Sequence, residues 1–423
     1  MDAAERVSDY LHPMLDALRA DPTRETEFWN DVARTRAPLI DADPASSQHS
    51  LVTYVWKLPP HARHVVVQPG FGDTTSNVME QIDGTRVCHA SYRYRNDVRA
   101  SYSFVPDMPL IAWATPSGKE LAELQAFMLA NRAQSDPHAR EEFVSRAGAG
   151  EPDVVTSVLA LHDAIDDSAA HKRAHVARGA IDKHTFMSRL LGNERNVWVY
   201  TPPGYATSDR ALPVLVIFDG GNALTQIPVH RMLDNLLADG RIQPVVGVFI
   251  DNPTPTSRND ELPCNETFAR FVEDEVLPWL RARYRVSHAR EDHYVTGVSY
   301  GGLASMWMGY RLPHVFGNIL SQAASLWWGP GYRIDVPRSE GGYTPEWLID
   351  RFAESARLPL RFWLEIGLLE HPSLMLEPNR RMKAVLEAKG YDVTYREFCG
   401  GHDSAMWRGS LIQALTTMLG PDV

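Results

Sequence analysis

The hydrophobic positions change their spacing twice along the chain and so divide it into three stretches. Between about 48 and 115, short β-branched and aromatic runs such as Leu51–Trp56 and His64–Gln68 predict strands. Turn residues such as Asp83-Gly84 separate these runs. Several short strands punctuated in this way predict a small antiparallel β-sandwich.

In the second stretch, from about 119 to 170, apolar positions recur mostly at helical spacing, including Val154–Ile165. We interpret it as a helical connecting region. Near the N-terminus, Val7, Leu11, Leu15 and Leu18 also recur at helical spacing and predict an amphipathic helix packed on the protein.

From about 172 onwards, strand and helix patterns alternate. Continuous apolar runs predict strands that are buried on both faces of a mostly parallel sheet, and amphipathic patterns between them predict crossover helices. A hairpin is predicted around Gly192-Asn193. The predicted strands are 214–218, 245–250, 319–320 and 362–366, and the predicted helices are 229–237, 267–283, 302–310 and 379–389. We therefore expect an N-terminal domain over 1–171 and an open α/β domain over 172–423.

Composition narrows the function classes without choosing one. With 42 Lys and Arg against 53 Asp and Glu, the net charge is −11, which argues against nucleic acid or an anionic membrane as partner. The three cysteines, Cys88, Cys264 and Cys399, lie too far apart for a CxxC metal site. Neither a signal-peptide core nor a membrane span is recognisable, so we expect a cytoplasmic protein.

The sharpest motif is Gly297-Val-Ser299-Tyr-Gly301, placed between a short apolar strand and a helix. This G-x-S-x-G pattern is typical of the nucleophile elbow of an α/β-hydrolase, where a tight turn requires small residues on both sides of the serine. We therefore expect Ser299 to be the nucleophile. The backbone N–H of Tyr300 would then face the oxyanion.

A catalytic serine needs a base and an orienting acid, which follow it in the order acid, then histidine. His402 follows the strand-like 393–399 and the flexible Gly400-Gly401, and is the best candidate base. His314 lies in a helix-ending turn, and His371 adjoins the candidate acid, so structural roles suit both.

The acid should follow the predicted strand 362–366. Glu370 lies in the loop just past Gly367 and is favoured over Glu365, which lies inside the strand, and over the more distant Glu377. Asp403, next to the base, is expected to brace its loop. A second oxyanion donor is expected after strand 214–218, from the N–H of Gly220 or Gly221.

Several segments resemble the enterochelin (ferric enterobactin) esterases. The resemblance is carried from about 185 to 420, and more weakly by Val52–Trp56, Gly84-Thr85, Asp97–Arg99 and Tyr102, which are similar to that family's N-terminal β-sandwich. The segments that carry it best are 297–304, 316–322, 325–328, 261–265, 400–403 and 407–409.

The resemblance implies hydrolysis of the serine ester bonds of a cyclic tri-catecholate siderophore, releasing iron inside the cell. It implies that Ser299 is the nucleophile, His402 the base and Glu370 the acid. It further implies a substrate-gripping Arg258 and a pocket lined by Trp327, Trp328, Trp407 and Arg408. No cofactor or metal is expected to be needed by the enzyme, since iron arrives with the substrate.

Two other functions stay open at this point. One is a carboxylesterase or acyltransferase of the wider esterase-D group that acts on a feruloyl, peptide or lactone ester. The other is a binding protein with an inactive hydrolase domain. None of these three functions implies a particular oligomeric state.

An anionic, aromatic substrate would need arginine and aromatic surfaces. The segment 87–104 interleaves arginines with tyrosines, which reads either as a solvated strand face or as one wall of a cleft. The residues concerned are Arg93, Arg95, Arg99, Tyr92, Tyr94 and Tyr102. Given the net charge of −11, such a substrate would demand that these arginines, with Arg258 and Arg408, form a local positive cleft. If the chain stays extended through Trp327-Trp328, one of the two rings can reach the pocket.

Overall fold

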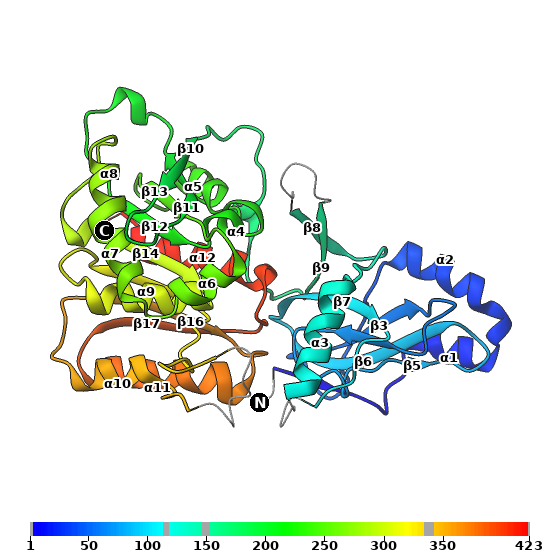
Figure 1. Cartoon of the computed structure of the whole chain (residues 1–423). Coiled ribbons are helices and arrows are strands. Elements are labelled where there is room, and N and C mark those ends of the chain that lie inside the picture. The colour runs from blue at the N-terminus through cyan, green and yellow to red at the C-terminus, as the bar shows by residue number, and fades with distance from the viewer. Residues whose placement is uncertain (1–2, 113–117, 146–152, 334–341, 422–423) are drawn as a thin grey trace.

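An α/β-hydrolase fold follows an antiparallel β-sandwich in the computed structural model, which describes residues 3–112, 118–145, 153–333 and 342–421. Figure 1 shows the two parts side by side, with the sandwich in blue and cyan and the hydrolase part in green to red. The fold class predicted from the sequence is confirmed.

Two antiparallel sheets form the sandwich. One runs in the order β1 (Ala4–Arg6), β6 (Val87–Arg95), β3 (His49–Lys57) and β2 (Leu39–Ala42), with β5 (Glu80–Gln81) paired to β6. The other runs β4 (Val65–Gln68), β7 (Arg99–Pro106), β9 (Val154–Ala160) and β8 (Glu141–Ser145). Alternation along each strand sends one face inward, and the core between the sheets includes Tyr54, Tyr92, Tyr94, Tyr102 and Phe104.

The helical prediction for Val154–Ile165 is wrong. Residues 154–160 form β9, which pairs antiparallel with β7 and β8. β-branched residues such as Val154, Val155 and Thr156 favour a strand, and an open sandwich edge beside β7 gives that strand its partner. Within the described part of this stretch, α3 (Gly118–Ala130) is the one α-helix.

The N-terminal helix starts later than its apolar spacing predicted. α1 spans Pro13–Ala20 and is followed by α2 (Glu25–Thr35). Leu15 and Leu18 are buried as expected, whereas Ala4–Arg6 form β1 and extend the sandwich.

Eight strands form the central sheet of the hydrolase part. The six strands β12 to β17 run parallel to one another, whereas β11 pairs antiparallel with β13. The predicted hairpin is present at one edge as β10 and β11. The order is β10 (Ala180–Met187), β11 (Glu194–Thr201), β13 (Val246–Ile250), β12 (Val214–Phe218), β14 (His293–Val298), β15 (Asn318–Gln322), β16 (Arg361–Gly367) and β17 (Asp392–Phe398).

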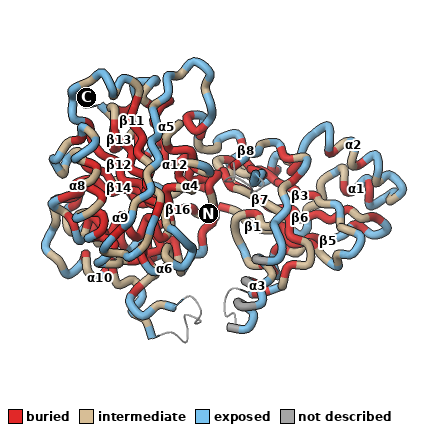
Figure 2. Tube along the Cα trace, turned by 45° about the horizontal axis from the view of Figure 1, so that its top comes forward, coloured by how far each residue is buried: buried red, intermediate tan, exposed pale blue. Residues whose placement is uncertain are grey.

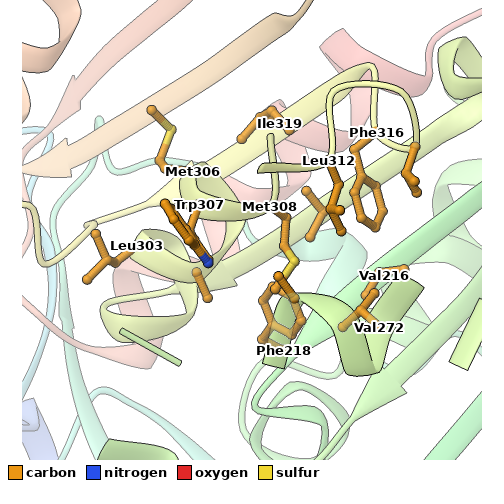
Figure 3. Close-up of a cluster of buried hydrophobic side chains, with 14 of the residues drawn as sticks. Val216, Phe218, Val272, Leu303, Met306, Trp307, Met308, Leu312, Phe316 and Ile319 are labelled. Carbon is orange, nitrogen blue, oxygen red and sulfur yellow. The ribbon is translucent and has the colours of Figure 1, made fainter. Parts of the chain in front are cut away.

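Helices cover both faces of this sheet and bury it, as Figure 2 shows by the red trace along β12, β13 and β14. One apolar cluster is formed with α7 (Glu266–Arg270), α8 (Leu277–Arg281), α9 (Tyr300–Arg311), α10 (Trp347–Glu354) and α11 (Glu377–Ala388). The other is formed with α5 (Val229–Ala238) and α12 (Ser404–Leu419). Figure 3 shows Met308 of α9 over Phe218 of β12, within the first cluster. Because α9 is packed on all sides, the turn that precedes it is held firmly.

Backbone contacts join the two parts at one seam. The Arg99 N–H at the start of β7 donates to the Cys399 carbonyl at 2.9 Å. Leu369 and Cys399 come from the hydrolase part but pack into the core of the sandwich. In the described part of the chain, no helix has the length and apolar character that crossing a bilayer requires.

Candidate active site

Ser299 occupies a strained turn between β14 and α9. Its backbone has φ 59° and ψ −117°, a conformation that residues with a side chain rarely adopt. A Cβ on Gly297 would lie 2.6 Å from the carbonyl carbon of Gly301, so the sharp turn requires glycine there. This is the geometry predicted for a nucleophile elbow. The Tyr300 N–H begins α9, at the helix end that favours negative charge.

His402 and Glu370 form a direct pair at the same edge of the sheet. Nδ1 of His402 lies 2.8 Å and 3.0 Å from the two carboxylate oxygens of Glu370. The Glu370 side chain is 3% exposed and the His402 side chain 39%. A carboxylate accepts, so Nδ1 carries the proton and Nε2 keeps a lone pair. The pair therefore has the tautomer that a general base needs.

Parallel strands bring these residues together. Ser299 follows β14, Glu370 follows β16 and His402 follows β17, and the carboxyl ends of parallel strands lie along one edge. Among the hydrogen bonds of the described residues, none joins Ser299 to His402; in unliganded sites this bond commonly tightens only when substrate binds.

Asp403 braces the histidine loop, as predicted. Its Oδ1 accepts from the N–H groups of Ala405 and Met406 and caps α12. The same oxygen accepts from the Ser101 N–H of β7 at 3.1 Å. Burial raises the pKa of Asp403, although these three N–H groups oppose the rise. A Cβ on Gly401 would lie 2.8 Å from the Gly70 carbonyl oxygen, so the loop is also packed tightly against the sandwich.

Glu365, the alternative acid, is fully buried and away from His402. Its carboxylate accepts from Gln322 Nε2 and Trp363 Nε1, both at 2.7 Å, and from the hydroxyl of Ser410. Burial raises its pKa to about 7, against the effect of these donors. Glu365 therefore ties β15, β16 and α12 together beneath the site.

The expected oxyanion loop lies beside the elbow. Asp219 has φ 53° and precedes α4 (Gly220–Thr225), so the Gly220 N–H begins that helix. The Gly221 N–H is directed to Asp251 Oδ1 at 3.4 Å. Of the two predicted donors, Gly221 is therefore already engaged by a carboxylate.

Arg258, in α6 (Pro255–Glu261), is engaged by Asp219. Its Nε and one terminal nitrogen each donate to an Asp219 oxygen at 2.7 Å. Its guanidinium carbon also lies 5.6 Å from the Tyr300 ring centre. Arg258 thus holds the oxyanion loop against the elbow, while 30% of its side chain stays exposed.

Ser325 is a site residue that the sequence reasoning did not single out. Its Oγ lies 3.3 Å from Ser299 Oγ, and its N–H donates to the Ser299 carbonyl. It is 2% exposed. The available signal was its position, just past the strand beside the nucleophile strand.

Aromatic rings pack against His402 and against Tyr300, the residue after Ser299. The Trp407 ring meets His402 edge-on at 4.9 Å and is 6% exposed. Trp327 packs 6.0 Å from Tyr300 and 4.8 Å from Tyr332, between ring centres. Trp327 and Trp328 are half-buried, but the expected extended chain is absent there, because the Trp328 N–H closes a turn onto Ser325.

The arginines that the sequence suggested for a positive cleft all have carboxylate partners. Arg408 is buried 3.8 Å from Asp167 and stacks 4.3 Å over Phe143, so it lies in the seam between the two parts. Each of the other predicted arginines likewise has a carboxylate partner. These pairs are Arg93 with Asp43 and Glu5, Arg95 with Asp97, Arg99 with Asp167 and Glu141, and Arg258 with Asp219.

The cavity directly behind the elbow is too small for an ester. It measures about 10 Å³ and is lined partly by Asp219, Gly297 and Gln322, which is barely room for one water. The described residues include no cluster of three or more His, Cys, Asp or Glu side chains that could hold a metal ion.

Comparison with known proteins places this architecture. Residues 188–418 match the "Putative esterase" family model, and residues 51–170 match the "Enterochelin esterase, N-terminal" family model. The iron(III) enterobactin esterase of Dickeya dadantii (strain 3937) is 28% identical over 99% of this chain and 98% of its own length. That of Escherichia coli O6:H1 is 30% identical over 81% of this chain and 82% of its own.

A solved structure agrees. The ferric enterobactin esterase of Salmonella typhimurium is 28% identical, with a TM-score of 0.75, over 93% of this chain and 98% of its own.

Proposed function

Since this chain belongs to the enterochelin esterase family, we propose that it hydrolyses the ester bonds of ferric enterobactin or a closely similar catecholate trilactone. Family membership makes it a carboxylic-ester hydrolase. The observation that carries the assignment of roles is the His402–Glu370 pair at the sheet edge where Ser299 sits on its strained turn.

In the first step, Ser299 Oγ attacks the ester carbonyl carbon while Nε2 of His402 accepts its proton. The carbonyl oxygen becomes an oxyanion, which the N–H groups of Tyr300 and Gly220 stabilise from two helix N-termini. Glu370 holds the imidazole in place and stabilises its positive charge.

The second step releases the alcohol. The carbon–oxygen bond of the ester breaks, and Nε2 gives its proton to the departing alkoxide. Water then enters, His402 takes one of its protons, and the oxygen of that water bonds to the acyl carbon. The bond from that carbon to Ser299 Oγ breaks, His402 returns the proton to Oγ, and the carboxylic acid leaves. Every proton passes through Nε2 of His402, so the Nε2 edge of this ring must point to the substrate.

Substrate recognition is proposed to use the aromatic and cationic groups around this edge. Trp327, Trp328 and Trp407 offer ring surface for catechols. Arg258 has a partly exposed guanidinium that can attract an anionic ligand while it stays paired with Asp219.

We also propose that the boundary between the N-terminal domain and the hydrolase domain lies between residues 171 and 172.

The test is mass spectrometry of products after incubation with ferric and iron-free catecholate trilactones, beside feruloyl and short-chain esters. We expect the trilactones to be opened to linear dihydroxybenzoyl-serine esters, and Ser299→Ala to abolish this. Faster turnover of the simple esters would instead indicate a general carboxylesterase. A fluorophosphonate should label Ser299, and an unlabelled folded protein would indicate a binding protein.

A further inference from the structure

A second cavity lies between α5 and the irregular segment that leads into β10. It measures about 70 Å³. Since one water needs about 10–15 Å³ of such space, a tetrahedral oxyanion fits. No proposed catalytic residue lines it; its lining residues are Lys172, Arg173, Val176, Arg178, His230, Arg231, Asp234 and Asn235.

Positive charge in this cavity exceeds its negative charge. Arg173 pairs with Asp239 at 2.9 Å. Asp234 Oδ1 accepts from the Gly179 N–H and the Tyr200 hydroxyl, both at 2.8 Å. With these two carboxylates counted against the four cationic side chains of the lining, two positive charges stay uncompensated.

Three of the four cationic side chains of the lining form no ion pair with the residues that the structure describes. Lys172 and Arg178 form no ion pair or hydrogen bond with any residue that the structure describes, and Arg231 donates only to the Ala170 carbonyl, at 3.3 Å. Burial, with the nearby Arg178 charge, lowers the pKa of Arg231. The cavity therefore has a positive potential, in contrast to the net charge of the chain.

The pKa of His230, which lines the cavity, is shifted in the direction that a positive potential predicts. Burial, then the charges of Arg231 and Arg178, lowers its pKa to about 4. Its Nδ1 is buried and has no hydrogen-bond partner. His230 and Arg231 lie in the first turn of α5, whose N–H groups also favour an anion.

We propose that this cavity is a binding site for a small dianionic oxyanion of the phosphate class. Two negative charges match the excess of two positive charges in the cavity. Arginine N–H groups suit tetrahedral oxygens, and Lys172 adds a point charge. A bound dianion raises the pKa of His230, because its charge opposes that of Arg178 and Arg231.

Binding there would act on the connection between the two parts of the molecule. Asn235 of α5 already holds this connection through the carbonyls of Ala169 and His171, both at 2.8 Å. The anion would extend that hold to Lys172 and Arg178, and so fasten the connecting segment to α5. This proposal does not depend on the identity of the ester substrate.

The test is calorimetric titration of the full chain with inorganic phosphate and with sulfate, with ionic strength held constant by sodium chloride. We expect one saturable site. The double variant Lys172→Gln/Arg178→Gln should weaken it at least tenfold. The control Lys119→Gln/Arg189→Gln removes the same charge from exposed side chains elsewhere and should leave binding unchanged. Equal weakening by both pairs, or no saturable site, overturns the proposal.

Proton uptake gives a second readout that nonspecific attraction would not produce. Sulfate does not titrate near neutral pH, so its binding at pH 6, compared in two buffers of different ionisation heat, reports protons taken up by the protein. We expect the wild type to take up protons when sulfate binds. We expect no uptake in His230→Asn, which keeps Asp234. Sulfate binding without proton uptake by the wild type would exclude the His230 pocket.

A phosphate monoester, titrated beside inorganic phosphate, distinguishes an esterified metabolite from the free ion, since the tighter ligand identifies the source.

Discussion

The hydroxyl oxygens of Ser299 and Ser325 lie 3.3 Å apart, on the carboxyl ends of two adjacent parallel strands. Ser325 is buried and also donates its N–H to the Ser299 carbonyl. It therefore touches the proposed nucleophile through both its side chain and its backbone, and fixes the direction of Oγ before substrate arrives.

Replacing Ser325 by alanine should lower kcat about tenfold, since one hydrogen bond contributes about 1–1.5 kcal/mol. KM should change little, because the contact is made by the nucleophile and not by substrate. Single-turnover acylation measures the effect directly. Ser305→Ala is the matched control, because the side chain of this buried serine bonds, among the described residues, only the Gly301 carbonyl within α9. Unchanged acylation in Ser325→Ala would exclude a positioning role.

The two glutamates of the 365–370 region should behave differently in activity assays. His402→Ala should reduce kcat by about 10²–10⁴, as expected for loss of a general base. Glu370→Gln should reduce kcat by a smaller factor than His402→Ala, because the acid orients the base and does not react. Glu365→Gln should leave kcat near that of the wild type at pH 7. A larger loss for Glu365→Gln than for Glu370→Gln would mean that the acid is misassigned.

Glu365 should instead appear in the pH dependence of stability. Its pKa is raised from 4.5 to about 7, so the folded state holds a proton that the unfolded state releases. Its contribution is therefore full below pH 4.5 and is lost as the pH rises to about 7, by about 3 kcal/mol. Urea unfolding at pH 5 and pH 8 should show this fall in the wild type and much less of it in Glu365→Gln. The exposed Glu194→Gln serves as control and should keep the wild-type fall.

Asp167 should be essential for the seam between the two parts. It lies 2.9 Å from Arg99 and 3.8 Å from Arg408, whose side chains are 7% and 6% exposed. Asp167→Asn leaves both charges buried without this partner, which should cost about 3–5 kcal/mol in the free energy of unfolding at pH 7. Asp163→Asn, a 65% exposed carboxylate nearby, should be neutral. Equal unfolding curves for the two variants would contradict this role.

The stabilisation by Asp167 should decrease at acidic pH. Burial alone would raise the pKa of Asp167, but the His171 hydrogen bond and the Arg99 charge outweigh it and lower the pKa. The stabilisation is therefore complete above the ordinary value of 3.8 and is lost as pH falls through the lowered pKa. The difference between Asp167→Asn and the wild type should shrink in that acid range.

Local signals made the proposed site residues predictable from the sequence. Ser299, Glu370 and His402 each follow a recognisable strand, and glycines precede the serine and the histidine. Strand ends of a parallel sheet converge, so three short motifs were enough to bring them to one edge.

Long-range pairing was not predictable in the same way. Arg99 and Arg408 share Asp167, which is distant from both in sequence, so their charges looked available for substrate. The helix prediction for residues 154–160 was wrong for a related reason. Its apolar spacing suits either a helix or a strand, and the open edge of β7 decided for the strand.

The Ser101 contact with Asp403 has a consequence for how this enzyme can be divided. The loop that presents His402 rests on backbone from a different part of the fold, at β7 and Gly70. A hydrolase part separated from its sandwich would keep its nucleophile, yet the imidazole would lose the surface that aligns it. Ester turnover therefore depends on the sandwich staying docked against the hydrolase part.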